Sequence, residues 1–210
     1  MRTPVGPSAL RVVAIALFGI LVGCNETPRK TSLPQGATVI ALGDSLTFGT
    51  GATPETSYPS VLAAASGWDV INAGVPGETA AEGCARLPGL IEDHRPQLVL
   101  VLLGGNDFLR RMPEQNVVAA LERCVESARA RNAEIALIPV PRFGASGIVD
   151  APLYAEAGRV WNVAVLDAGL SALIAQRALR ADAVHLNAAG YREMALNLVE
   201  GLRTQGWLAK

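Results

Sequence analysis

Histidine, cysteine and net charge are all scarce in this sequence, and each scarcity removes a class of function. Among 210 residues there are 2 histidines and 3 cysteines, with no Cys-x-x-Cys pair, so no metal site is expected. Eighteen Lys and Arg balance 19 Asp and Glu without forming a basic stripe, which argues against a nucleic-acid partner. There is no internal repeat. A chain of this length that is 50% hydrophobic predicts one globular domain with a substantial core.

The first 23 residues have the pattern of an export signal. Arg2 and Arg11 precede an apolar run over residues 12–23, which is too short to span a bilayer comfortably. The run ends in "LVGC", which resembles a bacterial lipobox and predicts that residues 1–23 are a lipoprotein signal peptide and that Cys24 is lipidated. An ordinary signal peptide or N-terminal anchor with a chance cysteine is the alternative. Residues 24–37 are polar and contain two prolines, so they are predicted to be a tether before a domain over 38–210.

A lipidated Cys24 would place the protein in the bacterial cell envelope, attached to a membrane through its lipid. Asn25 follows the cysteine, where Asp commonly retains lipoproteins at the inner membrane. The expectation is therefore the periplasmic face of the outer membrane.

From residue 38 onward, short apolar runs alternate with longer helical patterns. This alternation predicts an α/β domain with a parallel sheet and helices on both faces. The predicted strands cover 38–42, 68–74, 97–105, 133–141 and 163–168. The predicted helices cover 57–67, 78–94, 113–132, 151–162 and 187–207.

Polar residues with complementary chemistry follow these strands, where sites lie in parallel sheets. "GDSL" follows the first strand and contains Ser45, "NAGVPGET" contains Gly77, "GGND" contains Asn106, and "DAVH" near the end holds Asp182 and His185. A serine hydroxyl needs a base to become a nucleophile, and a histidine oriented by a carboxylate is such a base. Backbone N–H groups and an asparagine amide are suitable donors for an oxyanion.

These four blocks, in this order, resemble the SGNH (GDSL) hydrolase family, in its bacterial branch of arylesterases, lysophospholipases and thioesterases. The resemblance extends from about residue 38 to the last helix. It implies a three-layer flavodoxin-like fold with a five-stranded parallel sheet and ester hydrolysis without a cofactor. It also implies a catalytic triad of Ser45, Asp182 and His185, and an oxyanion hole formed by Ser45, Gly77 and Asn106.

Two positions depart from the family pattern. Glu78 stands where Asp is more frequent, and Leu186 follows His185 where proline is common. Neither change removes a catalytic atom, but the second bears on how rigidly His185 is held.

Several residues near the motifs have a second interpretation. Ser45 has the residue type of a helix cap, although the companion blocks favour a nucleophile. Asp44 either orders the serine loop or is simply an acid at a helix start. Phe108, Leu109 and Met112 either line an acyl pocket or belong to the core.

The sequence thus predicts a monomeric serine esterase that acts on aryl or acyl esters, or on lysophospholipids. An O-deacetylase of envelope glycans is the alternative enzyme. A non-catalytic binding lipoprotein is disfavoured, because it has no need of Ser45, Asp182 and His185 together.

Cys84 and Cys124 form an even pair if Cys24 is lipidated. They lie on the helices predicted after the second and third strands, which pack side by side in a flavodoxin-like fold. An oxidising compartment permits a disulfide between them. Two buried free thiols are an equal alternative.

Overall fold

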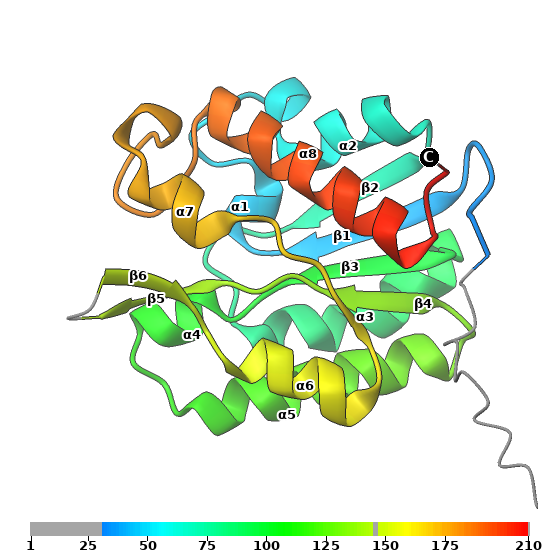
Figure 1. Cartoon of the computed structure of the whole chain (residues 1–210). Helices are drawn as coiled ribbons and strands as arrows, with labels where there is room; N and C mark the ends of the chain where they lie inside the picture. Colours follow the sequence, from blue (N-terminus) through cyan, green and yellow to red (C-terminus); the bar gives the residue numbers. More distant parts are fainter. Residues whose placement is uncertain (1–30, 145–146, 210) are drawn as a thin grey trace, which may run out of the picture.

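The computed structural model describes residues 31–144 and 147–209. The predicted signal peptide 1–23, Cys24 and residues 25–30 of the predicted tether lie outside the described residues. Within the described range, no helix combines the length and hydropathy needed to cross a membrane. Strands and helices alternate along this part of the chain and form three layers (Figure 1).

The central sheet has five parallel strands in the order β2-β1-β3-β4-β7. This order is that of flavodoxin-like folds. It confirms the predicted fold class. The strands are β1 (Thr38–Gly43), β2 (Asp69–Gly74), β3 (Leu98–Leu102), β4 (Glu134–Leu137) and β7 (Ala164–Val165).

Helices cover both faces of the sheet (Figure 1). One face carries α3 (Ala80–His94), α5 (Glu114–Arg129) and α6 (Leu153–Trp161), and the other carries α2 (Tyr58–Ser66), α7 (Leu170–Ala175) and α8 (Ala188–Gln205). Because both faces are covered, every residue of β3 is buried, which explains its unbroken apolar sequence.

The long helices begin where the sequence supplies caps. Thr79 and Glu82 form a reciprocal capping box at the start of α3. The Asn187 side chain accepts a hydrogen bond from the Gly190 N–H at the start of α8, and Gly206 ends that helix in a left-handed conformation.

Several short elements are absent from the sequence-based prediction. The strand predicted over 133–141 ends at Leu137, and an antiparallel pair follows, β5 (Pro141–Gly144) and β6 (Gly147–Asp150). The structure also has α1 (Ser45–Phe48), α4 (Gly105–Leu109) and two 3₁₀ turns, Pro54–Thr56 and Arg177–Leu179. α7 was not predicted either. Elements of three to six residues are too short to show a clear hydrophobic period.

β1, β2 and β3 end at the same level, and two glycines allow helix α1 to rest on that edge. Gly43 is in register with Gly74 on one side and with Leu102 on the other. A Cβ at Gly43 would lie 2.0 Å from the Thr47 hydroxyl oxygen, and a Cβ at Gly74 would lie 2.2 Å from the backbone nitrogen of Phe48. Only glycine fits at both positions, so α1, which begins with Ser45, is fixed directly above the strand ends.

A disulfide joins Cys84 on α3 to Cys124 on α5, with 5.1 Å between their Cα atoms. Both cysteines are buried at the seam between the two helices. Of the two alternatives that the sequence left open, the structure contains the disulfide.

This bond is expected to stabilise the fold. It links residues 40 apart in the sequence, and the chain-entropy model gives such a link about 4 kcal/mol. A C84A/C124A variant should therefore unfold in denaturant with a free energy lower by up to that amount. A reductant should destabilise the wild type but not the variant. If wild-type protein from an oxidising compartment shows two alkylated thiols by mass spectrometry without reductant, the disulfide is wrong.

Candidate active site

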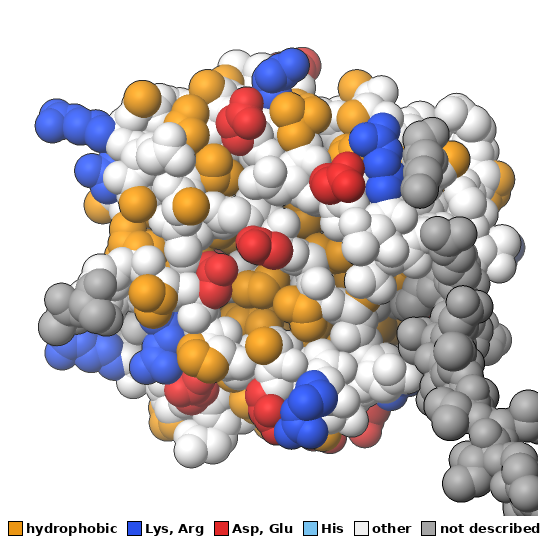
Figure 2. Space-filling view, viewed as in Figure 1, with side chains coloured by type: hydrophobic (Ala, Val, Ile, Leu, Met, Phe, Trp, Pro, Cys, Tyr) orange, Lys and Arg blue, Asp and Glu red, His pale blue; other side chains and the backbone are white. Residues whose placement is uncertain are grey.

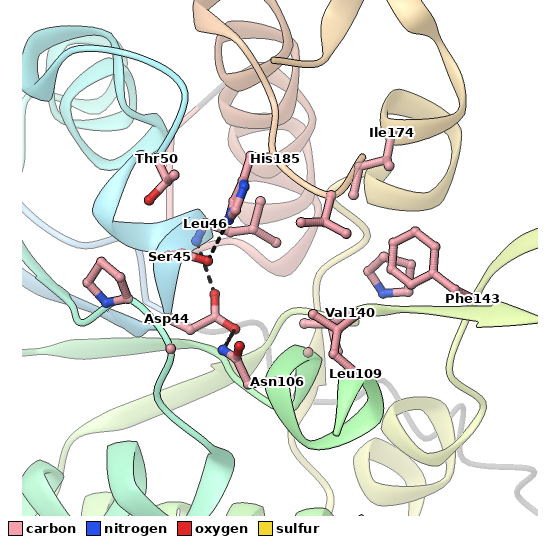
Figure 3. Close-up of a pocket in the computed structure, with 15 residues that line it drawn as sticks. Asp44, Ser45, Leu46, Thr50, Asn106, Leu109, Val140, Phe143, Ile174 and His185 are labelled. Atoms are coloured by element: carbon pink, nitrogen blue, oxygen red, sulfur yellow. Dashed lines mark hydrogen bonds between the residues drawn. The ribbon is translucent and has the colours of Figure 1, made fainter. Parts of the chain in front are cut away.

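The structure brings Ser45, His185 and Asp182 into one hydrogen-bonded chain, although 140 residues separate the serine from the histidine. His185 Nε2 lies 2.9 Å from Ser45 Oγ, and His185 Nδ1 lies 2.7 Å from Asp182 Oδ2 (Figure 3 shows the serine and histidine). With its proton on Nδ1, the ring donates to the carboxylate and leaves Nε2 free to accept the serine proton. This is the arrangement of an activated serine nucleophile.

The carboxylate of Asp182 is held in its ionised form. Partial burial pushes its pKa upward. Hydrogen bonds from the His185 ring and from the backbone N–H groups of Val184 and His185 outweigh this effect and lower the pKa to about 2. The carboxylate is therefore ionised near neutral pH, and its hydrogen bonds fix both the His185 ring and the loop that carries it.

Hydrogen bonds within the loop that carries His185 join its two ends. The Ala181 N–H donates to the His185 carbonyl at 2.9 Å, and Arg180 forms an isolated antiparallel bridge with Leu186. Leu186, which replaces the family's frequent proline, is completely buried. Packing of this side chain therefore holds the residue after His185 without the rigid ring of proline.

The three predicted oxyanion donors line the same pocket as the serine hydroxyl. The backbone N–H groups of Ser45 and Gly77 make no hydrogen bond to any of the described residues, so they are available to a ligand. Gly77 has φ +85°, a left-handed conformation that favours glycine. The Asn106 amide nitrogen lies 3.1 Å from Asp44 Oδ2 and 2.9 Å from the Glu78 carbonyl, and it donates to both.

Two arginines hold the loop that contains Gly77. Arg86 binds both carboxylate oxygens of Glu78, at 2.6 and 2.7 Å, and also the Ala73 carbonyl at 2.9 Å. Arg110 donates to the Gly77 carbonyl at 2.7 Å. Glu78, which stands where the family more often has Asp, thus serves as one end of a bidentate ion pair. Sequence reasoning did not single out either arginine.

Two buried carboxylates, Asp44 and Asp107, are the sequence neighbours of Ser45 and Asn106. Asp44 is 3% exposed, and its Oδ1 accepts a hydrogen bond from the Leu46 N–H at 3.0 Å, so it caps α1. Burial raises the pKa of this carboxyl to about 6, although the Leu46 hydrogen bond and the nearby His185 oppose the shift. Asp107 is fully buried, and its Oδ2 accepts from the Ala80 N–H, which ties α4 to the start of α3.

A cavity of about 310 Å³ opens from Ser45 and His185 toward apolar side chains (Figure 3). Of the three apolar residues singled out after "GGND", Leu109 lines it, whereas Phe108 and Met112 line a neighbouring depression. The other apolar residues of its wall include Leu46, Val140, Pro141, Phe143, Ile174 and Val184. Within the described residues no cluster of three or more metal-ligating side chains occurs.

A serine–histidine–aspartate chain at the carboxyl edge of a parallel sheet, beside an apolar cavity, defines the class of serine hydrolases on a flavodoxin-like fold. The GDSL-like lipase/acylhydrolase family model matches residues 41–193. The chain belongs to this family, whose members are also called SGNH hydrolases.

Similar proteins carry esterase names. An "Arylesterase" of Vibrio mimicus is 32% identical over 143 residues, which are 64% of this chain and 68% of that protein. "Esterase TesA" of Pseudomonas aeruginosa is 33% identical over 146 residues, which are 66% of this chain and 69% of that protein. A crystal structure of TesA superposes with a TM-score of 0.70 at 27% identity, over 80% of this chain and 99% of the other.

The buried Asp44 carboxyl should make the folded state less stable as the pH rises. Its pKa is about 6 in the folded state and about 4 when the chain is unfolded, so the folded state binds more protons between these values. The free energy of unfolding should therefore fall by about 2–3 kcal/mol between pH 4 and pH 7 because of this group. Denaturant titrations of wild type and Asp44→Ser at both pH values measure it. The fall should be smaller in the variant by that amount, and equal falls would contradict the prediction.

Proposed function

We propose that the protein is a serine esterase that hydrolyses carboxylic esters through an acyl-serine intermediate. The observation that carries the proposal is the 2.9 Å contact between Ser45 Oγ and His185 Nε2 at the mouth of an apolar cavity. Its relatives named arylesterase and esterase support the same reaction.

The reaction begins when Ser45 Oγ attacks the ester carbonyl carbon and its proton passes to His185 Nε2. Asp182 stabilises the imidazolium that forms. The negative oxygen of the tetrahedral intermediate is positioned for the N–H groups of Ser45 and Gly77 and for the Asn106 amide. Collapse breaks the bond to the alcohol, which leaves with the proton from Nε2. Water then repeats the sequence on the acyl-serine and releases the carboxylic acid.

The cavity favours an acyl chain longer than acetate. Val140, Phe143 and Ile174 lie beyond the serine and present apolar groups to the cavity (Figure 3). An acetyl group would leave most of that apolar surface in contact with water. This argues for aryl or medium-chain acyl esters over the O-deacetylase alternative.

The substrate is expected to be a small molecule and not a strongly anionic polymer. On the face shown in Figure 2, cationic and anionic side chains are interspersed and no basic patch is seen. The chain has a formal net charge of −1. Neither feature favours binding of a nucleic acid.

Lipid attachment at Cys24 is part of the same proposal. The first described residues lie at the opposite end of the sheet from Ser45, where the Leu33 N–H donates to the Trp207 carbonyl (Figure 1). A chain anchored at Cys24 would therefore carry its pocket at the end of the domain away from the tether. This arrangement favours esters that arrive from the aqueous compartment over lipids of the anchoring leaflet.

The first test concerns the nucleophile and the acyl chain. The wild type should hydrolyse p-nitrophenyl esters, and kcat/KM should rise with chain length by up to about fourfold for each methylene that enters the cavity. A fluorophosphonate probe should label it stoichiometrically. Ser45→Ala should lose both labelling and hydrolysis because the attacking oxygen is gone.

Ser60→Ala on α2 is the matched control, and it should be labelled like the wild type. Equal labelling of Ser45→Ala would refute the assignment of the nucleophile. Turnover confined to acetyl esters, with activity on acetylated polysaccharide, would favour the deacetylase instead.

The second test concerns the anchor. Cys24→Ser should release the protein from the membrane fraction or block its processing, because the thiol that carries the lipid is absent. Membrane sedimentation and the mass of the mature protein measure this. The purified variant should keep the wild-type rate on a soluble ester. Unchanged membrane association and mass would remove lipidation from the proposal.

A further inference from the structure

The side chain of Asn106 is oriented by two acceptors. Its Nδ2 donates to Asp44 Oδ2 at 3.1 Å and to the Glu78 carbonyl at 2.9 Å (Figure 3 shows the contact with Asp44). An ionised carboxylate and a backbone carbonyl cannot donate. If the amide were flipped so that its oxygen and nitrogen exchanged places, the oxygen would face both of these acceptors. The pair therefore selects the orientation in which the nitrogen, and not the oxygen, faces Asp44 and Glu78, beside the pocket that Ser45 and Asn106 both line.

Asp44 uses its two carboxylate oxygens for different purposes. Oδ1 caps α1 through the Leu46 N–H, and Oδ2 accepts from Asn106. Capping needs only one oxygen, and serine would supply it without burying a charge. A carboxylate that is only 3% exposed carries a desolvation cost that capping does not explain.

We propose that Asp44 is a positioning residue for the oxyanion site, which acts by holding the amide nitrogen of Asn106 toward the carbonyl oxygen under attack. The inference rests on the proposed esterase function. In the free protein both N–H groups of the amide donate hydrogen bonds, one to Asp44 and one to the Glu78 carbonyl. The developing oxyanion would therefore share one N–H group with the acceptor that this group already has. No rotation of the amide is then required during the reaction, which is the condition for preorganised stabilisation.

Because the oxyanion exists only in the transition state, loss of Asp44 Oδ2 should lower kcat and leave KM nearly unchanged. Asp44→Ser separates this role from capping. The serine hydroxyl can still accept from the Leu46 N–H, but it has no second oxygen to reach Asn106.

A double-mutant cycle tests the proposal. Asn106→Ala should lower kcat on a p-nitrophenyl ester by about 10²–10³-fold. Asp44→Ser should lower kcat by about tenfold, the loss expected when a hydrogen bond to a charged group is removed. The double variant should be no slower than Asn106→Ala alone, because Asp44 has no target once the amide is absent.

The matched control is Asp167→Ser. Asp167 also accepts a hydrogen bond from the N–H two residues ahead, that of Gly169, but it lies outside the pocket. This variant should keep the wild-type kcat. Asp44→Asn replaces one of the two acceptor oxygens with a donor, and the same cycle can be run with it if Asp44→Ser does not fold.

Multiplicative losses in the double variant would overturn the proposal, since they would mean that Asp44 acts elsewhere, for instance through the charge of His185. A wild-type kcat in Asp44→Ser would overturn it as well. Failure of the esterase function itself would look different: the wild type would then neither hydrolyse the ester nor react with the fluorophosphonate probe.

Discussion

The parallel pairing of β1 with β2 on one side and with β3 on the other is the interaction on which the site depends. The pairing aligns Gly43, Gly74 and Leu102 at one edge of the sheet. Because the three strands end together, the segments that follow them start from adjacent points. Ser45, Gly77 and Asn106 are thereby brought to one pocket from three separate stretches of sequence. The two glycines are needed because α1 lies almost in contact with the strand backbones.

Charge buried near this edge opposes folding and serves the site. Asp44 is almost inaccessible to water, and its raised pKa reflects a folded state that tolerates the charge only at a cost. Asp107 is fully buried, and only its Oδ2 has a hydrogen-bond partner among the described residues. Both carboxylates face the N-terminal ends of helices, where backbone N–H groups partly compensate them. The buried carboxylates therefore lower the stability of the fold in the same region in which they fix the geometry of Asn106 and its neighbours.

The rim of the pocket is held by contacts with residues that lie outside the motifs. Arg86 clamps Glu78, Arg110 fixes the Gly77 carbonyl, and the buried Leu186 secures the loop after His185. The departures from the family pattern at positions 78 and 186 are therefore accommodated by contacts. Glu78 is held by its ion pair with Arg86, and Leu186 is held by packing in the core.

The sequence by itself determined the strand–helix alternation, the parallel sheet and the identity of the residues at its edge. Apolar runs such as "LVLVL" and residue types such as Ser45 and His185 are local properties, so they can be read without coordinates. Tertiary structure alone decided the bond between Cys84 and Cys124, which requires two helices at the right separation. It also decided the β5–β6 pair, whose strands of four residues each are too short to show a clear hydrophobic period. The cavity wall was decided in the same way, because it combines Phe143 with residues from distant segments such as Leu46 and Ile174. The two partners of the Asn106 amide belong to the same group: hydrogen bonds across 62 and 28 residues depend on packing, which no local pattern encodes.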